Sequence, residues 1–217
     1  APGSTARIDA SGPMAPSRIG VSGYFLIFVR LTLLFVALLG CVPFYYLFQW
    51  LRVWQIWPRI FLSAVATIAG LRIRIRGDRR SGALLLSNHV SWMDIPALSV
   101  ASGSAFVAHD GLARHGLLRR LCEMNDTVFI ARDRRTGVQE QIEQVRAALR
   151  EAGALTLFPE GTTADGVTLL PFKSALLSAI DPLPAGIAVQ PVLLAYADAP
   201  DIAWLDEEPG IDNFMRI

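Results

Sequence analysis

The chain has 217 residues and a formal net charge of +1 at pH 7, and its mean hydropathy is +0.41. This small charge excludes a domain built to coat nucleic acid, because such domains carry a strong excess of Lys and Arg on one face. Hydrophobic residues make up 53% of the chain and charged residues only 18%, which favours a lipid partner. The length suits one α/β domain with an accessory segment. The two cysteines have no Cys or His neighbour at metal-ligand spacing, so the sequence predicts no disulfide framework and no metal site.

The N-terminal third of the chain predicts a tail followed by a membrane anchor. Residues 1–20 are rich in Ala, Pro, Gly and Ser and predict a disordered tail, whereas residues 21–70 predict anchoring helices. The run 31–51 contains no charged residue, and a helix of this length just reaches across a hydrocarbon core of about 30 Å. The apolar stretch 60–71 is too short to span. One crossing and two helices lying in one leaflet both fit, and a core helix of a soluble protein is the competing interpretation.

Arginines are distributed unevenly around this anchor. Three precede or enter it, Arg7, Arg18 and Arg30, and seven follow it closely, at positions 52, 59, 72, 74, 76, 79 and 80. Positive charge collects on the cytoplasmic side of membrane proteins. We therefore expect a protein of the cell inner membrane whose remaining domain, 71–217, faces the cytoplasm.

The region after the anchor alternates between strand and helix patterns. Residues 71–76 have strict period two, which is typical of a strand with one wet face. Helical periodicity is clearest over 137–151. This alternation predicts an α/β fold with a mostly parallel sheet flanked by helices, whose ligands bind at the carboxyl ends of the strands. Five short apolar runs predict its buried strands: 83–87, 105–108, 127–131, 154–158 and 187–194.

The first motif follows the apolar run 83–87. His89 and Asp94 are five residues apart, about 140° around a continuous helix, so a turn must intervene if their side chains are to meet. We expect Ser91 to cap a helix and Asp94 to lie in its first turn. The carboxylate would then fix the imidazole tautomer, and His89 would act as a general base.

The second motif, Phe158-Pro159-Glu160-Gly161-Thr162, also lies at the end of an apolar strand. Proline ends the strand, and glycine permits an unusual backbone conformation. Glu160 and Thr162 thereby place polar groups at the carboxyl edge of the sheet, where they could hold the hydroxyl groups of a substrate.

The order of motifs resembles one family. Asn88-His89-x4-Asp94 is followed by Phe129 to Arg132, by the Phe-Pro-Glu-Gly-Thr motif, by Pro171-Phe172-Lys173 and by Val189 to Val192. From about residue 72 to 194 this order resembles the glycerolipid acyltransferases typified by 1-acylglycerol-3-phosphate acyltransferase.

The resemblance implies a direct acyl transfer without a cofactor. His89 would deprotonate the acceptor hydroxyl with Asp94 as its partner, and the oxygen would attack the thioester of acyl-CoA or acyl-carrier protein. Arg132 would meet the acceptor's phosphate, because its planar donor fork suits phosphate. The residues that the resemblance places in substrate binding are Asn88, Arg132, Phe158, Pro159, Glu160, Gly161, Thr162, Lys173 and Pro191.

Two features depart from the family pattern. The third motif usually continues with Arg-Ser, but this chain has Thr163-Ala164, which leaves the acceptor's head group open and looks closer to the lyso-ornithine lipid acyltransferase branch. Lys173 either supplies the missing positive charge or is a solvated residue at a turn. The chain also stops earlier than family members usually do, and we expect a C-terminal portion to be missing.

The sequence therefore predicts a membrane-bound O-acyltransferase that acts on a lysolipid. The leading acceptor is 1-acyl-sn-glycerol-3-phosphate, which would give phosphatidic acid, and lyso-ornithine lipid or another lysophospholipid is the alternative. A non-catalytic lipid-binding homologue and a thioester hydrolase are the competing hypotheses.

Overall fold

The structure, a computed structural model, describes residues 20–51, 56–109, 116–125, 127–130, 143, 146–150, 153–174, 177, 183, 186–205 and 213. The predicted tail up to residue 19 and most of the predicted helix 137–151 lie outside these ranges. Of that helix, residues 143 and 146–150 are described, and all are helical.

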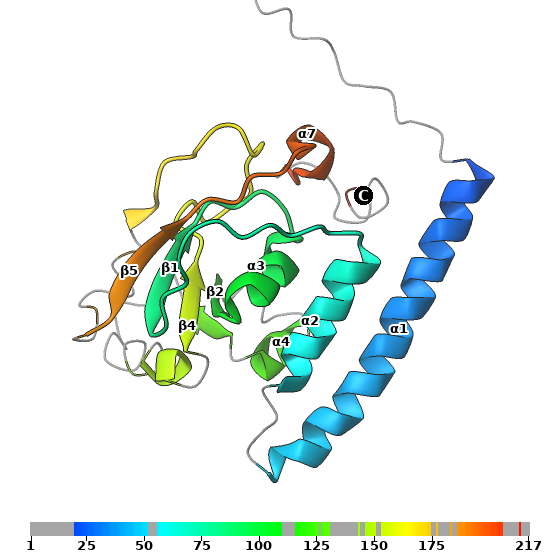
Figure 1. The fold of residues 1–217 in the computed structure, drawn as a ribbon, viewed down its shortest axis with the longest axis horizontal. Coiled ribbons are helices and arrows are strands. Elements are labelled where there is room, and N and C mark those ends of the chain that lie inside the picture. The colour runs from blue at the N-terminus through cyan, green and yellow to red at the C-terminus, as the bar shows by residue number, and fades with distance from the viewer. Residues whose placement is uncertain are drawn as a thin grey trace, which may run out of the picture.

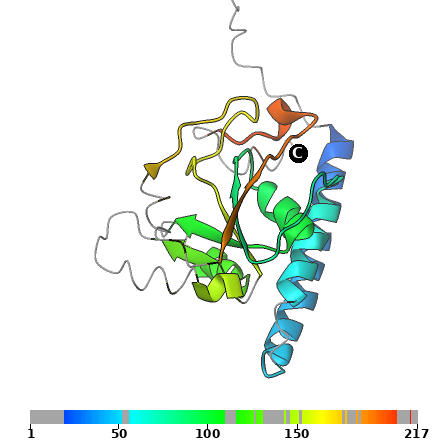
Figure 2. The same cartoon turned by 60° about the vertical axis from the view of Figure 1, so that its left-hand side comes forward.

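Two apolar helices form the N-terminal part. Helix α1 (Val21–Gln49) is long and apolar enough to cross a membrane, and only 6% of its most apolar 18-residue window is buried within the protein. This exposure argues against the core helix of a soluble protein. Helix α2 (Ile56–Ile68) is shorter and runs back beside α1 (Figures 1 and 2). The described residues therefore agree with an N-terminal apolar anchor.

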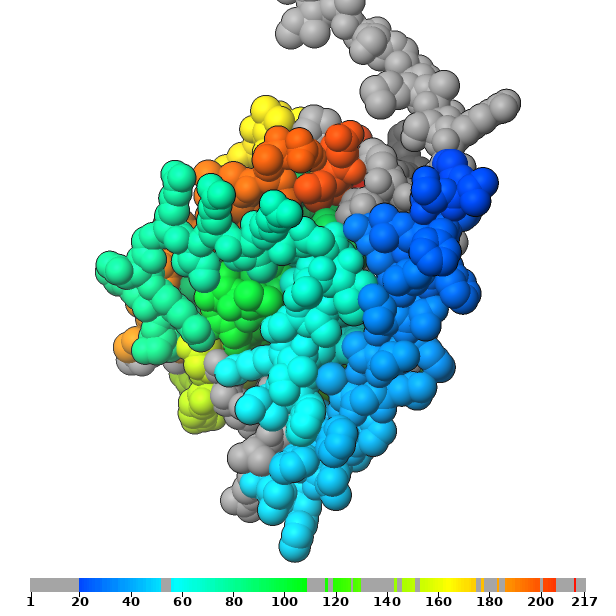
Figure 3. Space-filling model, turned by 45° about the vertical axis from the view of Figure 1, so that its right-hand side comes forward, coloured from blue at the N-terminus to red at the C-terminus, as the bar shows by residue number. Residues whose placement is uncertain are grey.

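Aromatic rings join the two helices where they approach their connection. Phe44 of α1 stacks on Trp57 of α2 with 4.8 Å between ring centroids, and Phe48 lies 5.5 Å from the same indole. The space-filling view shows the helices in contact along one face of the molecule (Figure 3). Many large apolar side chains of α1 are exposed, so the pair formed by α1 and α2 packs against the rest of the fold through one side only.

Within the described residues, the sheet has five strands, all parallel, in the order β3-β2-β4-β1-β5. Each of the five predicted apolar runs corresponds to one strand, although the ends differ by one or more residues in four of them, and the predicted α/β fold with a parallel sheet is confirmed. Strands β1 and β4 are buried on both faces, as parallel strands covered by helices usually are, which explains why they appear in the sequence as continuous apolar runs. The strands are β1 (Ala83–Ser87), β2 (Ala105–His109), β3 (Val128–Ile130), β4 (Ala154–Leu157) and β5 (Ala188–Val192).

The register of β1 places the two sequence motifs side by side. Leu86 lies opposite Leu157 of β4 on one side and Pro191 of β5 on the other. Consequently the loops that follow β1 and β4, which carry the two motifs, leave the sheet at the same edge.

The predicted strand at 71–76 is wrong. These residues form no regular secondary structure, and their arginines are exposed. Among the described residues, β1 lies between β4 and β5, so the segment before it has no position beside β1 in the sheet. The residues that follow the segment are held by a side chain, because Gln190 accepts from the Arg80 amide and donates to the Asp78 carbonyl. The alternation of apolar and basic residues indicates one solvent-exposed face, but it does not indicate whether a neighbouring strand is available for pairing.

Helices cover the sheet and join it to the anchor. Helix α3 (Asp94–Ser102) packs against α2, and its Leu98 joins Phe106 and Phe158 in an apolar cluster on one face of the sheet. The main core cluster includes Leu155 and Leu157 of β4, which are almost fully buried. Helix α4 (Gly116–Met124) follows β2, and the short helix α7 (Ala199–Ile202) follows β5 (Figure 1).

Candidate active site

The loop after β1 brings His89 and Asp94 together across a turn. Helix α3 begins at Asp94, so the two side chains are not on one continuous helix. The expectation that Ser91 caps this helix is wrong: its hydroxyl is buried and has no hydrogen-bond partner among the described residues. The Asp94 carboxylate accepts the hydrogen bonds of the turn instead, from the amides of Val90 at 2.6 Å and Ser91 at 3.0 Å. Helix α3 therefore begins without a side-chain cap, and the carboxylate at its first residue holds the preceding turn.

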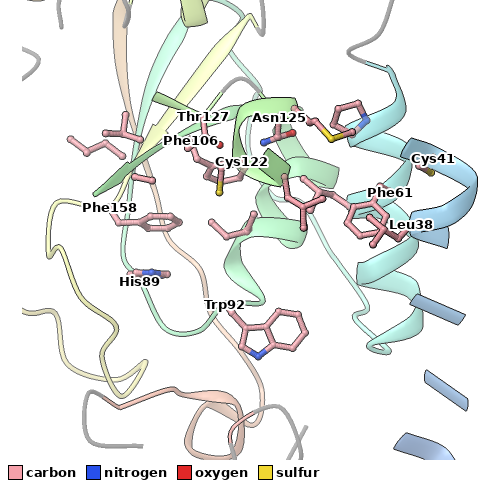
Figure 4. A pocket seen from close by; sticks show the side chains of 18 of the residues that line it. Leu38, Cys41, Phe61, His89, Trp92, Phe106, Cys122, Asn125, Thr127 and Phe158 are labelled. Carbon is pink, nitrogen blue, oxygen red and sulfur yellow. The ribbon is translucent and has the colours of Figure 1, made fainter. Parts of the chain in front are cut away.

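The His89–Asp94 pair has the geometry of a general base with its partner. His89 Nδ1 lies 2.7 Å from Asp94 Oδ2, and the Asp94 side chain is fully buried. Because Nδ1–H donates to the carboxylate, Nε2 is the nitrogen that remains to accept a proton. The ring stacks on Phe158, with 4.0 Å between centroids and 17° between planes (Figure 4). Two motifs far apart in sequence therefore fix one imidazole.

The buried side chain of Glu160 connects the two motif loops through hydrogen bonds. Its side chain is only 1% exposed. One carboxylate oxygen accepts from the His89 amide at 3.0 Å and the other from the Leu170 amide at 2.8 Å. The Ala164 amide adds a further bond, to the His89 carbonyl at 2.8 Å. Glu160 therefore positions the backbone of His89, and both its oxygens are occupied by backbone groups.

We expect Glu160→Gln to lower the free energy of unfolding by about 2 kcal/mol, because an amide NH₂ would face a backbone N–H in place of a carboxylate oxygen. Urea unfolding in detergent, followed by tryptophan fluorescence, measures the difference. Glu143→Gln is the matched control, because Glu143 is exposed and its one ion pair within the described residues is with Arg146 on the surface. The stability of this variant should therefore change by less than about 0.5 kcal/mol. Equal effects in both variants would contradict the role of Glu160.

A cavity of about 640 Å³ opens beside His89. It extends from the two motif loops to the anchor helices, and Figure 4 shows His89, Phe158 and Trp92 at one end and Cys122, Asn125 and Thr127 at another. Its lining is mainly apolar. The anchor helices contribute Leu38, Cys41 and Val42 from α1, and Trp57, Pro58, Phe61 and Leu62 from α2. Among the described residues, no cluster of His, Cys, Asp or Glu could hold a metal ion.

The predicted substrate-binding residues divide into two groups. Phe158, Gly161 and Thr162 line the cavity beside His89. Gly161 has a φ of 68°, a conformation that favours glycine. Pro159 is buried and its carbonyl accepts from the Lys173 amide at 2.8 Å.

Other predicted residues lie away from this cavity. Asn88 uses its whole side-chain amide on the Leu194 backbone, accepting at 2.7 Å and donating at 3.0 Å. Lys173 and Pro191 are exposed and do not line the cavity. Arg132 lies outside the described residues, so its role stays a prediction.

Sequence reasoning missed Tyr196 and Trp204, which come from the segment after β5. The Tyr196 hydroxyl donates to Asp94 Oδ1 at 2.7 Å. The Trp204 amide donates to the Val90 carbonyl at 2.9 Å, its carbonyl accepts from the Thr163 hydroxyl, and the residue lines the cavity. The only available signal was that β5 ends at the same sheet edge as β1, which brings the residues after it close to the first motif.

Comparison with known proteins places these features in context. Residues 72–195 match the model of the Acyltransferase family. The chain is 36% identical over 189 residues to the lyso-ornithine lipid O-acyltransferase of Brucella abortus (strain 2308), covering 82% of this chain and 69% of that protein. It is 39% identical over 122 residues to the 1-acyl-sn-glycerol-3-phosphate acyltransferase of Neisseria gonorrhoeae, covering 56% and 47% respectively. The chain thus spans between about half and about two thirds of the length of these two relatives.

The fold also resembles a solved structure. The crystal structure of the 1-acyl-sn-glycerophosphate acyltransferase from Thermotoga maritima superposes with a TM-score of 0.54 at 17% identity, covering 89% of each chain. At this identity the likeness concerns the fold alone.

Proposed function

The chain belongs to the Acyltransferase family, and on that premise we propose that it moves a fatty acyl group from acyl-CoA or acyl-carrier protein to the free hydroxyl of a lysolipid. The observation that carries this proposal is the His89 imidazole, which lines the cavity while its Nδ1 is held by the buried Asp94 carboxylate. Nε2 takes the proton of the acceptor hydroxyl as the oxygen attacks the thioester carbonyl carbon. The C–S bond then breaks, and the departing thiolate takes that proton from the imidazolium.

The cavity fits the acyl chain in this scheme. Its volume of about 640 Å³ lies within the usual range for small-molecule sites, and its walls are mainly apolar. Because α1 and α2 form one side of it, a hydrocarbon chain could pass to His89 without crossing water. We therefore propose that the acyl chain lies in this cavity and that the acceptor hydroxyl approaches His89 beside Thr162.

For the acceptor we propose lyso-ornithine lipid. Thr163 occupies the position at which the family pattern has an arginine. Its hydroxyl donates a hydrogen bond to the carbonyl of Trp204, a residue that lines the cavity. None of the residues that line the described cavity is Lys or Arg. An indole suits a cationic head group, such as the ammonium of ornithine, better than a phosphate. The name and 82% coverage of the Brucella relative support this choice.

The second candidate is 1-acyl-sn-glycerol-3-phosphate. It is favoured by the Neisseria relative and by Arg132, whose guanidinium could meet a phosphate. The two acceptors differ in head-group charge, so one assay separates them.

We expect acyl transfer to lyso-ornithine lipid to exceed transfer to 1-acyl-sn-glycerol-3-phosphate by about tenfold or more in kcat/KM. The assay uses the full chain in detergent micelles, a panel of lysolipids and one acyl donor at a time, and quantifies acylated lipid. Preference for the phosphate acceptor would overturn the lyso-ornithine assignment, and donor cleavage that no lysolipid accelerates would overturn acyl transfer itself.

Thr163→Arg tests the head-group argument directly. Arginine there supplies a phosphate-binding fork and removes the bond to Trp204, so the preference should move toward 1-acyl-sn-glycerol-3-phosphate. Val167→Arg is the matched control, because Val167 is 80% exposed and lies outside the cavity. The substitution adds the same charge four residues later in the chain. An equal shift in both variants would indicate general attraction rather than a site.

We further propose that the protein resides in the inner membrane with its α/β domain on the cytoplasmic face. The apolar exposed surface of α1 and the arginines that follow the anchor support this orientation. Both acyl donors are water-soluble, so the domain that receives them must face the compartment that contains them.

A further inference from the structure

The Asp94 carboxylate accepts hydrogen bonds from several groups besides His89. Oδ2 accepts three hydrogen bonds, from His89 Nδ1 and from the amides of Val90 and Ser91. Oδ1 accepts from the Tyr196 hydroxyl at 2.7 Å. The three bonds to Oδ2 come from the motif itself, whereas the bond to Oδ1 comes from a residue 102 positions later. The second oxygen therefore depends on the segment after β5.

Asn88 fastens that segment to the first motif. Its side chain makes a two-bond contact with the backbone of Leu194, at 2.7 and 3.0 Å, two residues before Tyr196. A closed path results, from Asn88 to Leu194, along the chain to Tyr196, and through its hydroxyl to Asp94. Asn88 directly precedes His89, so the path begins and ends within the same motif.

We propose that Tyr196 is a positioning residue for acyl transfer, and that Asn88 acts through it. The Tyr196 hydroxyl holds Oδ1 so that Oδ2 faces His89, and it draws part of the carboxylate's charge away from the imidazole. The inference rests on the proposed function of His89 as general base. In this role Tyr196 tunes how strongly His89 holds a proton, without touching substrate.

The hydroxyl can donate throughout the working pH range. Burial raises the pKa of Tyr196 far above its usual value, and the adjacent Asp94 charge and the hydrogen bond to it act in the same direction. The phenol therefore stays protonated in any ordinary assay. Among the described residues, the ionisable side chain that contacts the His89 backbone is Glu160, which is bound to two backbone amides. The thiols of Cys41 and Cys122 line the same cavity but lie away from His89 (Figure 4).

Removing the hydroxyl has a predictable sign. Without a donor on Oδ1, the Asp94 carboxylate keeps more of its negative charge for the imidazolium of His89 and stabilises it more strongly. The acidic limb of the kcat/KM profile should therefore move to higher pH. We expect a shift of about half a pH unit or more in Tyr196→Phe. Because the Tyr196 hydroxyl that holds Oδ1 and keeps Oδ2 toward His89 is then absent, kcat should fall about tenfold, with KM for the lysolipid nearly unchanged.

Tyr46→Phe is the matched control. It also removes a tyrosine hydroxyl that makes a hydrogen bond, here with Arg120 at 2.8 Å, but on α1 and outside the cavity. Both variants are assayed from pH 5 to 9 with the same donor and acceptor. A parallel measurement without turnover follows the rate of His89 modification by diethyl pyrocarbonate against pH, with His89→Ala as the blank. A shift in Tyr196→Phe alone, in both measurements, is the expected result.

Several outcomes would overturn the inference. An unmoved acidic limb in Tyr196→Phe, or an equal shift in Tyr46→Phe, would leave the hydroxyl with a structural role only. Loss of folding in Tyr196→Phe would also contradict it, because a group that acts only on the pair should leave the unfolding temperature within a few degrees. If the proposed function itself fails, the unaltered chain will show no lysolipid-dependent product, which separates the two failures.

A double variant tests the route through Asn88. If Asn88 acts through Tyr196, the kcat loss in Asn88→Ala combined with Tyr196→Phe should be close to that of the larger single loss. Losses that multiply would show that Asn88 acts on another part of the site.

Discussion

Replacing His89 by Ala is expected to lower lysolipid acylation by at least about a thousandfold. The imidazole is the group that lines the cavity with a free accepting nitrogen, since its Nδ1 is bound to Asp94. Without it, the acceptor hydroxyl must lose its proton to water in a mainly apolar cavity. Release of free thiol from the donor and formation of acylated lipid, measured together, give the loss. Membrane association and the unfolding temperature serve as controls, because alanine at this position removes no part of the anchor.

The same experiment separates the competing functions. Retained acylation in His89→Ala would contradict the proposed mechanism and would favour a different base. A non-catalytic lipid-binding protein would give no thiol release in either form. A thioester hydrolase would release free acid at the same rate with and without lysolipid, and that release would depend on His89.

Replacing Asp94 by Asn should cost between about 10² and 10⁴ in kcat. The asparagine carbonyl can keep the position of Oδ2 and accept from His89 and the amides of Val90 and Ser91, while its NH₂ donates to the Tyr196 oxygen. The geometry of the turn is therefore retained and only the negative charge is lost. That charge stabilises the imidazolium formed when His89 takes the proton.

The loss in Asp94→Asn should appear in kcat with little change in KM for the lysolipid, because Asp94 is fully buried and does not line the cavity. Asp78→Asn is the control, since this aspartate is exposed on the segment before β1. Its kinetics should match those of the unaltered chain. Activity within about threefold of normal in Asp94→Asn would show that the carboxylate serves the turn and not the reaction.

Much of the sheet could be predicted because burial on both faces leaves a plain trace in the sequence. The run 83–87 coincides with β1, and the run 127–131 contains the shorter β3 (Val128–Ile130). The turn between His89 and Asp94 could be inferred as well, since five residues of helix would separate the two side chains. These features depend on local pattern, which a single sequence contains.

What could not be predicted depends on contacts between distant parts of the chain. Glu160 and Asn88 were expected to bind substrate. In the structure, Glu160 accepts a hydrogen bond from the His89 amide, and Asn88 makes two hydrogen bonds with the backbone of Leu194. The spacing of residues in a sequence does not distinguish a substrate contact from a contact of this kind. Tyr196 belongs to no motif. The segment 71–76 alternates as a strand does, yet the position beside β1 is already filled by β5.

Because α1 and α2 supply one wall of the cavity, the proposed membrane anchor would also be part of the proposed catalytic interior. Trimming the chain to begin at β1 would remove Leu38, Cys41 and Phe61 from that wall and admit solvent to a compartment built for hydrocarbon. Water could then compete with the lysolipid for the thioester. If the proposed function holds, the same two helices would attach the protein to the bilayer and protect the activated acyl group from water.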